Sequence, residues 1–412
     1  MNTQTKPSNK KIVFWNAAGS LCSAASSFLY LFITTRICGA EVAGDWSITI
    51  AIAQLMWTIG VFEATTYFAT DATDRFTSEE YFGFKFLTCA LMALVSVFYV
   101  LSFNFTQDKN TLAFWLCALK LVDAFGMYYF AAFQKAGRLD ISGFSSVWQV
   151  LVSVISFTAV ILTTQNVVWA VIAATVLKAL WILIYNNKRL DEVAPISGPD
   201  FNSKAMKDLF LELLPLFCAT FLANYLSNVP KYAIENLGTS TMQAAFNIIF
   251  MPSFVINLFV IFVMRPLLTP LATTWAKGDV KKFLNTTTKI MLAVFGMTAL
   301  VLLGSWLIGI PILEFVFKVD LSNCLKALLI VMLGGGLASA SSVLYNDIII
   351  LRRQRLVLLA YGSAVVVSSL LANPLVANMQ LEGAAWTYLI SNAVLLVVYT
   401  VIFFITLKDA KK

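Results

Sequence analysis

The sequence predicts an all-α polytopic membrane protein with about twelve transmembrane helices in two six-helix lobes. Hydrophobic residues make up 59% of its 412 positions and charged residues only 12%. A soluble domain usually carries ~25% charged residues, which cover its surface. Apolar runs of about 20 residues, the length that crosses a bilayer, follow one another along the whole chain. These observations together favour a protein that is almost entirely embedded in the membrane.

Each predicted span is an apolar run bounded by polar or turn-forming residues. The twelve ranges are 12–35, 43–67, 82–103, 111–133, 142–163, 167–186, 209–233, 241–265, 286–309, 325–350, 355–377 and 383–407. Residues 310–323 are expected to form an interfacial turn, because Pro311, Glu314 and Asp320 interrupt their apolar character. The first run lacks a small-x-small cleavage site, so we expect a retained span rather than a signal peptide.

Basic residues indicate the orientation of the spans. Most of them fall in loops after even-numbered spans and at both ends of the chain, and those in the loops are Arg75, Lys85, Lys135, Arg138, Lys188, Arg189, Lys204, Lys207, Lys277, Lys281, Lys282, Arg352, Arg353 and Arg355. The positive-inside rule then places both termini in the cytoplasm, which requires an even number of crossings. The net charge of +7 needs no nucleic-acid partner, because basic loops match the anionic headgroups of membrane lipids.

The longest polar segment divides the chain. Residues 191–208 are rich in Pro, Gly and charge and are predicted to be a cytoplasmic linker. They separate an N-terminal six-helix lobe, residues 1–190, from a C-terminal six-helix lobe, residues 209–412. Two lobes of this kind place a substrate site between them.

Several kinds of chemistry are missing from the chain. It has no histidine, which removes histidine-based acid–base catalysis. It has no GxxxxGK[ST] phosphate loop and no CxxC cluster, so neither ATP hydrolysis nor a metal site is expected. The predicted outer loops are too short for the carboxylate-bearing loop that a membrane glycosyltransferase needs. No catalytic residue, metal or cofactor is therefore predicted, and a gradient-driven transporter fits better than an enzyme.

Ionisable residues within the spans are the candidates for a functional site. Each costs about 2.5–3.5 kcal/mol to insert, so several of them imply a hydrated cavity. The cations are Lys120, Lys178, Arg36 and Lys231, and the carboxylates are Asp45, Glu63, Asp123 and Asp347. Structural roles are open for each: Lys120 and Asp123 stand three apart on one helix and can neutralise one another, Lys178 can snorkel, and Arg36 can be interfacial. Asp45 can cap a helix and Asp347 can pair with Arg352 or Arg353.

Other polar groups and helix breakers gather in the second lobe. Asn224, Asn228, Asn247 and Asn257 would suit a path lined by sugar or water. Pro215, Pro230, Pro252, Pro266 and Pro270 and the Gly334–Gly336 run are typical of membrane helices that bend.

Three stretches of the chain resemble a known family. They are ICGAEVAGDWSITIAIAQLMWTIGVFEATTYFATD, YYFAAFQKAGRLDISGFSS and NVPKYAIENLGTSTMQAAFNIIFMPSFVINLFVIFVMRPLLTPLA. The second contains an aromatic-x-x-x-Gln-x-x-x-Arg-x-Asp-x-x-Gly-x-Ser turn formed by Gln134, Arg138, Asp140, Gly143 and Ser145. In order and content they resemble the Wzx-type polysaccharide flippases of the multidrug/oligosaccharidyl-lipid/polysaccharide exporter superfamily.

The resemblance implies a V-shaped pair of six-helix bundles in the bacterial cytoplasmic (inner) membrane. It implies that polyprenyl-diphosphate-linked oligosaccharide is moved across that membrane by alternating access, for cell-surface polysaccharide biosynthesis. Lys120, Lys178, Arg36 and Lys231 are then candidates for the diphosphate, the four asparagines for sugars, and Asp45, Glu63, Asp123 and Asp347 for coupling to an ion or proton gradient. A polysaccharide polymerase or other glycan-assembly proteins are the implied protein partners.

Three alternatives remain open. The first is a gradient-coupled small-molecule exporter of the same fold, which acidic cavity residues would favour because drug substrates are usually cationic. The second is a membrane enzyme of glycan assembly, and the absent histidine and short outer loops weigh against it. The third is a scaffold that transports nothing, for which substitutions of cavity charges would be silent.

Overall fold

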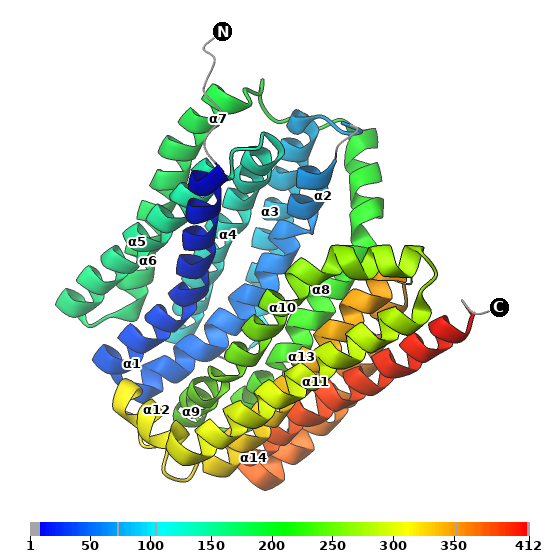
Figure 1. Cartoon of the computed structure of the whole chain (residues 1–412). Coiled ribbons are helices and arrows are strands. Elements are labelled where there is room, and N and C mark those ends of the chain that lie inside the picture. Colours follow the sequence, from blue (N-terminus) through cyan, green and yellow to red (C-terminus); the bar gives the residue numbers. More distant parts are fainter. Residues whose placement is uncertain (1–8, 72–73, 104, 352, 354, 410–412) are drawn as a thin grey trace. The chain divides into compact units, whose positions relative to one another are not determined.

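The computed structural model describes residues 9–71, 74–103, 105–351, 353 and 355–409, and every regular element among them is helical. Figure 1 labels the α-helices in chain order, and two short π-helical segments are named η1 and η2. Their bounds are α1 Asn9–Val61, α2 Ala64–Thr70, α3 Ser78–Leu101, α4 Gln107–Lys135, α5 Leu139–Thr164, α6 Val167–Trp181, η1 Ile182–Asn186, α7 Asn187–Val193, α8 Ser203–Leu237, α9 Ser240–Phe250, α10 Ser253–Ala276, α11 Val280–Gly304, η2 Ser305–Gly309, α12 Ile310–Phe317, α13 Leu325–Ile350 and α14 Arg355–Asp409. The outermost basic residues of both termini, and Arg352, lie outside the described residues.

Ten helical segments in the described part of the chain are long and apolar enough to cross a membrane. Two of them, Lys10–Val61 and Leu356–Lys408, are each interrupted by one residue with non-helical backbone angles, Gly39 and Gln380. Counting the halves of these two helices separately gives the twelve spans that the sequence predicts. Gly39 has φ 87° and ψ 177°, a conformation that only glycine adopts at low cost.

Two predicted spans are interrupted inside their ranges. The span predicted at 43–67 stops where α1 ends at Val61, because Phe62 and Glu63 take left-handed conformations with φ of 47° and 55° before α2 begins. The span predicted at 241–265 is divided between α9 and α10 at Met251 and Pro252, and α10 then continues to Ala276. A proline at this point lacks the N–H that an unbroken helix would need.

The predicted turn at 310–323 is wrong in its first half. The helix continues through η2 and α12 to Phe317, and only at Lys318, with φ 55°, does the chain leave it. Pro311 lies in the first turn of α12. Proline is tolerated there because a new helical turn needs no N–H donor at that position, and the π-helical residues of η2 supply the change of register just before it.

The chain falls into two compact units, Met1–Phe221 and Leu222–Lys412, and α8 contributes its first half to unit 1 and its second half to unit 2. The predicted linker 191–208 holds the end of α7, an irregular stretch and the first turns of α8. This stretch is fixed on α3, because the N–H of Asp200 donates to the main-chain oxygen of Glu79 across 2.9 Å.

In unit 1, α1 packs against α3, α4 and α5, and α6 packs against α4 and α5 (Figure 1). The crossing of α1 and α5 depends on glycine. A Cβ atom added to Gly143 would lie 2.2 Å from the main-chain oxygen of Trp15, and one added to Gly19 would lie 2.9 Å from the oxygen of Gly143. These two helices therefore approach backbone to backbone, which explains why a glycine stands at position 143 of the Gln134–Ser145 motif.

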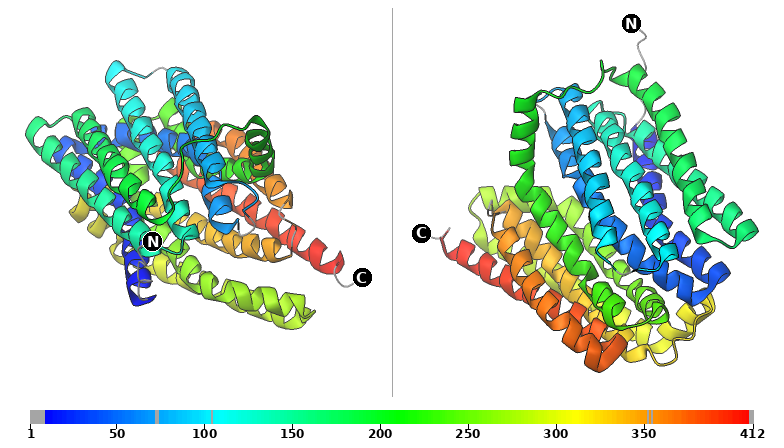
Figure 2. Two further views of the ribbon diagram at one scale, coloured as in Figure 1. Left: turned by 90° about the horizontal axis from the view of Figure 1, so that it is seen from above. Right: turned by 180° about the vertical axis from the view of Figure 1, so that it is seen from behind.

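Unit 2 is built around α13, which packs against α9, α10, α11 and α14; Figure 2 shows α13 and α14 side by side. The Gly334–Gly336 run does not interrupt this helix, since α13 is continuous from Leu325 to Ile350. Each glycine instead makes room for a different neighbour. Added Cβ atoms would lie 2.5 Å from the Tyr388 ring, 2.8 Å from Ser253 and 2.4 Å from Thr298, so the run allows three helices to pack closely on α13.

Candidate functional site

A polar cavity of about 240 Å³ lies inside unit 1, among α1, α4, α5 and α6. Hydroxyl and amide side chains make up much of its wall: Ser23, Ser26, Ser27 and Gln54 from α1, Ser142, Ser145, Ser146 and Gln149 from α5, and Asn186 from η1. Trp57, Phe130 and Phe133 add aromatic surface. Polar side chains in such number at membrane depth require water or a polar ligand.

Three charged side chains meet in this cavity. Lys120 and Asp123 stand one helical turn apart on α4, and their Nζ and Oδ2 atoms are 3.2 Å apart. Lys178 reaches from α6 to the other oxygen of the same carboxylate, Oδ1, so Asp123 forms ion pairs with both lysines. The side chains of Lys120, Asp123 and Lys178 are 19%, 21% and 12% exposed. Two ammonium groups share one carboxylate, which gives the cluster a net charge of +1.

A hydrogen-bonded network at this cavity centres on Ser145. Its hydroxyl donates to Oδ1 of Asn186 across 2.6 Å and accepts from Nε2 of Gln149 at 2.9 Å and Nε1 of Trp181 at 3.2 Å. This gives Ser145, from the Gln134–Ser145 motif, a defined role in holding α5 against η1 and α6. The hydroxyl of Ser142, one turn earlier, is buried and makes no hydrogen bond within the protein. Such a group is normally satisfied by water or ligand.

The other motif residues act at the start of α5. Arg138 pairs with the buried Asp140 through two nitrogens, with Nε 3.0 Å and Nη2 3.2 Å from the two carboxylate oxygens. This fork is the strong geometry for an arginine–carboxylate pair. It fixes the turn from which the cavity-lining face of α5 begins.

Only some of the charged residues that the sequence predicts as site candidates line this cavity. Lys120, Asp123 and Lys178 all line it, and their mutual pairing was foreseen only for the first two. Asp45, also a candidate for coupling, forms an ion pair with Lys109 across 3.2 Å instead. Glu63 accepts a hydrogen bond from Thr220 at 2.7 Å. Arg36 is half-buried with its guanidinium over the Phe32 ring. None of the last three candidates lines the cavity of unit 1.

The remaining candidates belong to unit 2. Lys231 is 8% exposed, with its ammonium 5.6 Å from the centre of the Phe250 ring. Asp347 is fully buried and accepts a hydrogen bond from Thr287 at 2.9 Å, while its other oxygen has no hydrogen-bond partner within the protein.

The four asparagines of the second lobe are not equivalent. Asn228 is buried, and its amide donates to the main-chain oxygen of Asn224 across 2.9 Å. Asn224 and Asn247 are half-buried, whereas Asn257 is exposed on α10.

Sequence reasoning missed the buried position of Lys85 and did not include the serines of α1 among the site candidates. Lys85 was assigned to a cytoplasmic loop, yet its side chain is buried inside α3. Its position 25 residues after Gly60 gives no local signal of the contact that they make. The serines of α1 did carry a signal, because Ser23, Ser26 and Ser27 interrupt an apolar run at the spacing of one helix face.

No protein-family model matches the chain, and no curated protein matches it. Solved structures are similar in fold. An inward-facing multidrug resistance MATE-family transporter of the MOP superfamily has a TM-score of 0.75 at 14% identity, with 94% of each chain covered. The lipid II flippase MurJ in an inward closed conformation has a TM-score of 0.67 at 12% identity, with 93% of this chain and 87% of that chain covered. A MOP-superfamily transporter from Pyrococcus furiosus has a TM-score of 0.61 at 14% identity, covering 98% and 96%.

These likenesses establish the fold. The chain has the all-helical architecture of MOP-superfamily transporters, and the proteins that share it in these comparisons are membrane transporters and flippases, not enzymes. A multi-pass membrane protein is the class that the composition predicts. The finer assignment to the Wzx-type flippases, and the choice of substrate, are matters of proposal.

Proposed function

We propose that the chain is a flippase that moves a polyprenyl-diphosphate-linked oligosaccharide across the bacterial cytoplasmic membrane by alternating access, for cell-surface polysaccharide biosynthesis. The observation that carries the proposal is the cluster of Lys120, Asp123 and Lys178 in the cavity of unit 1. Its excess of one positive charge favours an anionic substrate group. Two ammonium groups can bind separate oxygens of a phosphate as charge-assisted donors.

The uncharged part of the wall supports a sugar. Hydroxyls and amides from α1 and α5 present both donors and acceptors, and Ser142 has a buried hydroxyl that its neighbours leave unsatisfied. The side chain of Trp57 on the same wall offers an apolar face of the kind that packs on sugar rings. A cavity of about 240 Å³ holds a headgroup portion and not a long oligosaccharide, so the proposal assigns it to the part of the substrate nearest the charge.

Substitution of the lysines tests the proposal. In proteoliposomes loaded with a lipid-linked oligosaccharide, Lys120→Ala is expected to abolish translocation, and Lys178→Gln to reduce it at least about tenfold, because each removes charge from the cluster. Lys188→Gln, an exposed lysine on α7 outside the cavity, is the matched control. Membrane insertion of all three should equal that of wild type. Normal translocation by Lys120→Ala would remove this residue from the mechanism.

A gradient-coupled exporter of small cationic molecules is the second candidate. Asp123 favours it, because this carboxylate lines the cavity and would attract a cation. The Asp123→Asn variant separates the two functions. It raises the charge of the cluster from +1 to +2, so flipping of an anionic substrate should survive, whereas binding of a cationic drug should be lost. Resistance to cationic compounds that depends on Asp123, with no oligosaccharide flipping, would replace the first candidate by the second.

A further inference from the structure

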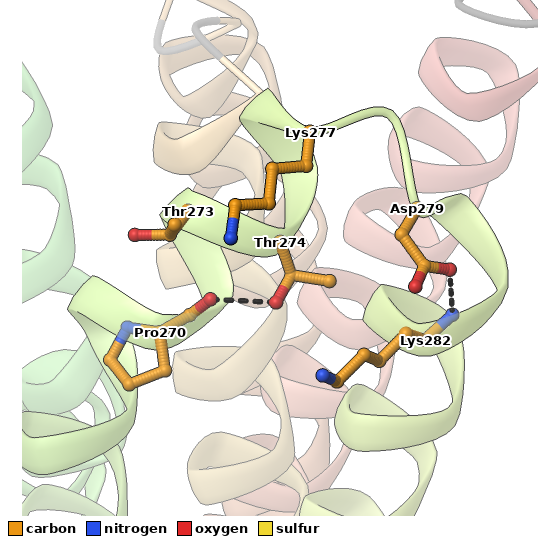
Figure 3. Close-up of a pocket in the computed structure, with 6 residues that line it drawn as sticks. All are labelled: Pro270, Thr273, Thr274, Lys277, Asp279 and Lys282. Carbon is orange, nitrogen blue, oxygen red and sulfur yellow. Dashed lines mark hydrogen bonds between the residues drawn. The ribbon is translucent and has the colours of Figure 1, made fainter.

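The hairpin between α10 and α11 in unit 2 has a fixed shape. The helix α10 ends at Ala276, Gly278 takes a left-handed conformation with φ 75°, and Asp279 caps α11. The cap is direct, since Oδ1 of Asp279 accepts from the N–H of Lys282 across 2.9 Å (Figure 3). Gly278 after α10 and the capping residue Asp279 before α11 therefore define a tight turn between the two helices.

A pocket of about 290 Å³ opens on this hairpin. Its walls are Pro270, Thr273, Thr274, Lys277, Asp279 and Lys282. Figure 3 shows Lys277 from the end of α10 and Lys282 from the first turn of α11 reaching towards the same space beside Thr274. The two lysines thus line one pocket from the end of α10 and the start of α11.

Positive charge dominates this hairpin. Lys277, Lys281 and Lys282 are all exposed, against the single carboxylate of Asp279. That carboxylate is already engaged with the N-terminal end of α11, where a negative group offsets the helix dipole. Within the described residues, neither Lys277 nor Lys282 forms an ion pair with a carboxylate. The lining of this pocket therefore suits an anion.

The surroundings of the pocket place it at the level of lipid headgroups. Trp275, half-buried near the end of α10, packs its ring 5.4 Å from that of Phe283 on α11. Tryptophan next to lysine is typical of the membrane interface. Farther along α11, Leu292 and Phe295 are exposed apolar residues, as expected of a helix whose surface meets acyl chains. The positive-inside rule puts this loop in the cytoplasm, where anionic lipids are concentrated.

We propose that this pocket, formed by Lys277 and Lys282, binds the phosphate of an anionic phospholipid of the cytoplasmic leaflet. The lysines hold the phosphate from two helices, Trp275 lies at the headgroup level, and the acyl chains follow the exposed apolar side of α11. The site is independent of the cavity in unit 1 and of the substrate proposed for it. It gives the α10–α11 hairpin a lipid that fixes its height in the membrane.

Lipid retention by the full-length protein tests the site. The protein would be purified from bilayers of equal phosphatidylglycerol and phosphatidylcholine, and retained lipid counted by native mass spectrometry. Wild type should retain phosphatidylglycerol preferentially, and the double variant Lys277→Gln/Lys282→Gln should lose about tenfold or more of that preference. Lys204→Gln/Lys207→Gln, which removes two exposed lysines at the start of α8, is the matched control and should behave as wild type. Lys277→Arg/Lys282→Arg keeps the charge and should restore retention.

Each other outcome overturns the proposal. Equal loss in the test and control pairs would mean that phosphatidylglycerol responds to overall charge and not to this pocket. Undiminished preference in Lys277→Gln/Lys282→Gln would place the lipid elsewhere. Displacement of phosphatidylglycerol by millimolar inorganic phosphate would identify a site for a free anion in place of a lipid. The substituted lysines are exposed, so an unchanged melting temperature should accompany every variant.

Discussion

Lys85 donates a hydrogen bond to the main-chain oxygen of Gly60 across 2.9 Å, from a side chain that is only 2% exposed. The same ammonium donates to the oxygen of Val61 at 3.2 Å, and the hydroxyl of Thr88 donates to that of Gly60 at 2.9 Å. These carbonyls are released where α1 ends and Phe62 turns left-handed. A cation is well placed there, because the C-terminal end of a helix carries partial negative charge. Lys85 is therefore a structural residue of the break between α1 and α2.

Replacing Lys85 by methionine should destabilise the protein. The variant keeps the length of the side chain but removes the ammonium donor from the oxygens of Gly60 and Val61, of which only Gly60 keeps a second donor in Thr88. This loss costs about 2–3 kcal/mol. Melting in detergent, followed by tryptophan fluorescence, measures the effect. The same change at the exposed Lys204 is the control. If both variants melt at the same temperature, the contacts of Lys85 contribute nothing to stability.

The ion pair between Asp123 and Lys178 should show energetic coupling. Asp123→Asn leaves both lysines without their shared carboxylate, and Lys178→Met leaves Asp123 paired with Lys120 alone. The double variant removes both members of the pair under test. Removing one partner of a buried pair is costly, but these side chains are partly hydrated, so we expect a coupling of about 1–2 kcal/mol. A double-mutant cycle of unfolding free energies measures it. Additive effects of the two substitutions would mean that the pair is not formed in the membrane.

Gly143 should tolerate no side chain. Gly143→Ala places its methyl group against the main-chain oxygen of Trp15, 2.2 Å from the added Cβ, so α1 and α5 must separate at a cost of about 1–3 kcal/mol. Gly296 is the matched control, because it lies within α11 with open space at its Cβ position. Gly296→Ala should stabilise the protein by up to about 1 kcal/mol. Melting temperatures that shift in the same direction for both variants would contradict the packing of α1 on α5.

The helical fold and the number of spans follow from the sequence, because apolar length alone decides whether a segment can cross a bilayer. Helix ends are less predictable. Pro311 looks like a stop, but a π-helical segment just before it places the proline in a first turn where it is tolerated. The left-handed residues of the break between α1 and α2, Phe62 and Glu63, are neither glycine nor proline. The carbonyls at this break are bound by Lys85, more than twenty residues later.

The candidate site was half predictable for a related reason. Lys120 and Asp123 stand three apart on one helix, so their pairing can be inferred locally. Lys178 joins them from another helix, 55 residues beyond Asp123, and only the packing of α4 on α6 brings the two together. The same applies to Asp45, whose partner Lys109 lies on α4. Charged residues inside predicted spans can be recognised in the sequence, because their insertion into the membrane costs free energy. Their ion-pair partners cannot, because these depend on which helices are neighbours.

The predicted orientation can be tested by cysteine labelling. The described loops alternate along the chain, so Ala136 and Ala276 should face the cytoplasm while Gln165 and Thr241 should face the outside; all four are exposed. After replacement of the six native cysteines, single cysteines at these positions would be treated with a membrane-impermeant maleimide in intact cells. Only the cysteines at 165 and 241 should react, and those at 136 and 276 should react after permeabilisation.

The pattern of labelling separates an error of orientation from an error of span count. Full reversal, with 136 and 276 labelled in intact cells, would show that the basic loops lie outside and that the positive-inside argument fails for this chain. It would also place Lys277 and Lys282 in the outer leaflet, away from most anionic lipid. Labelling of 165 and 136 from the same side would instead show that α5 does not cross the membrane, although its 26 residues are long enough. Agreement at all four positions fixes the direction of spans 5 to 8 and, with an unbroken alternation, puts both termini in the cytoplasm.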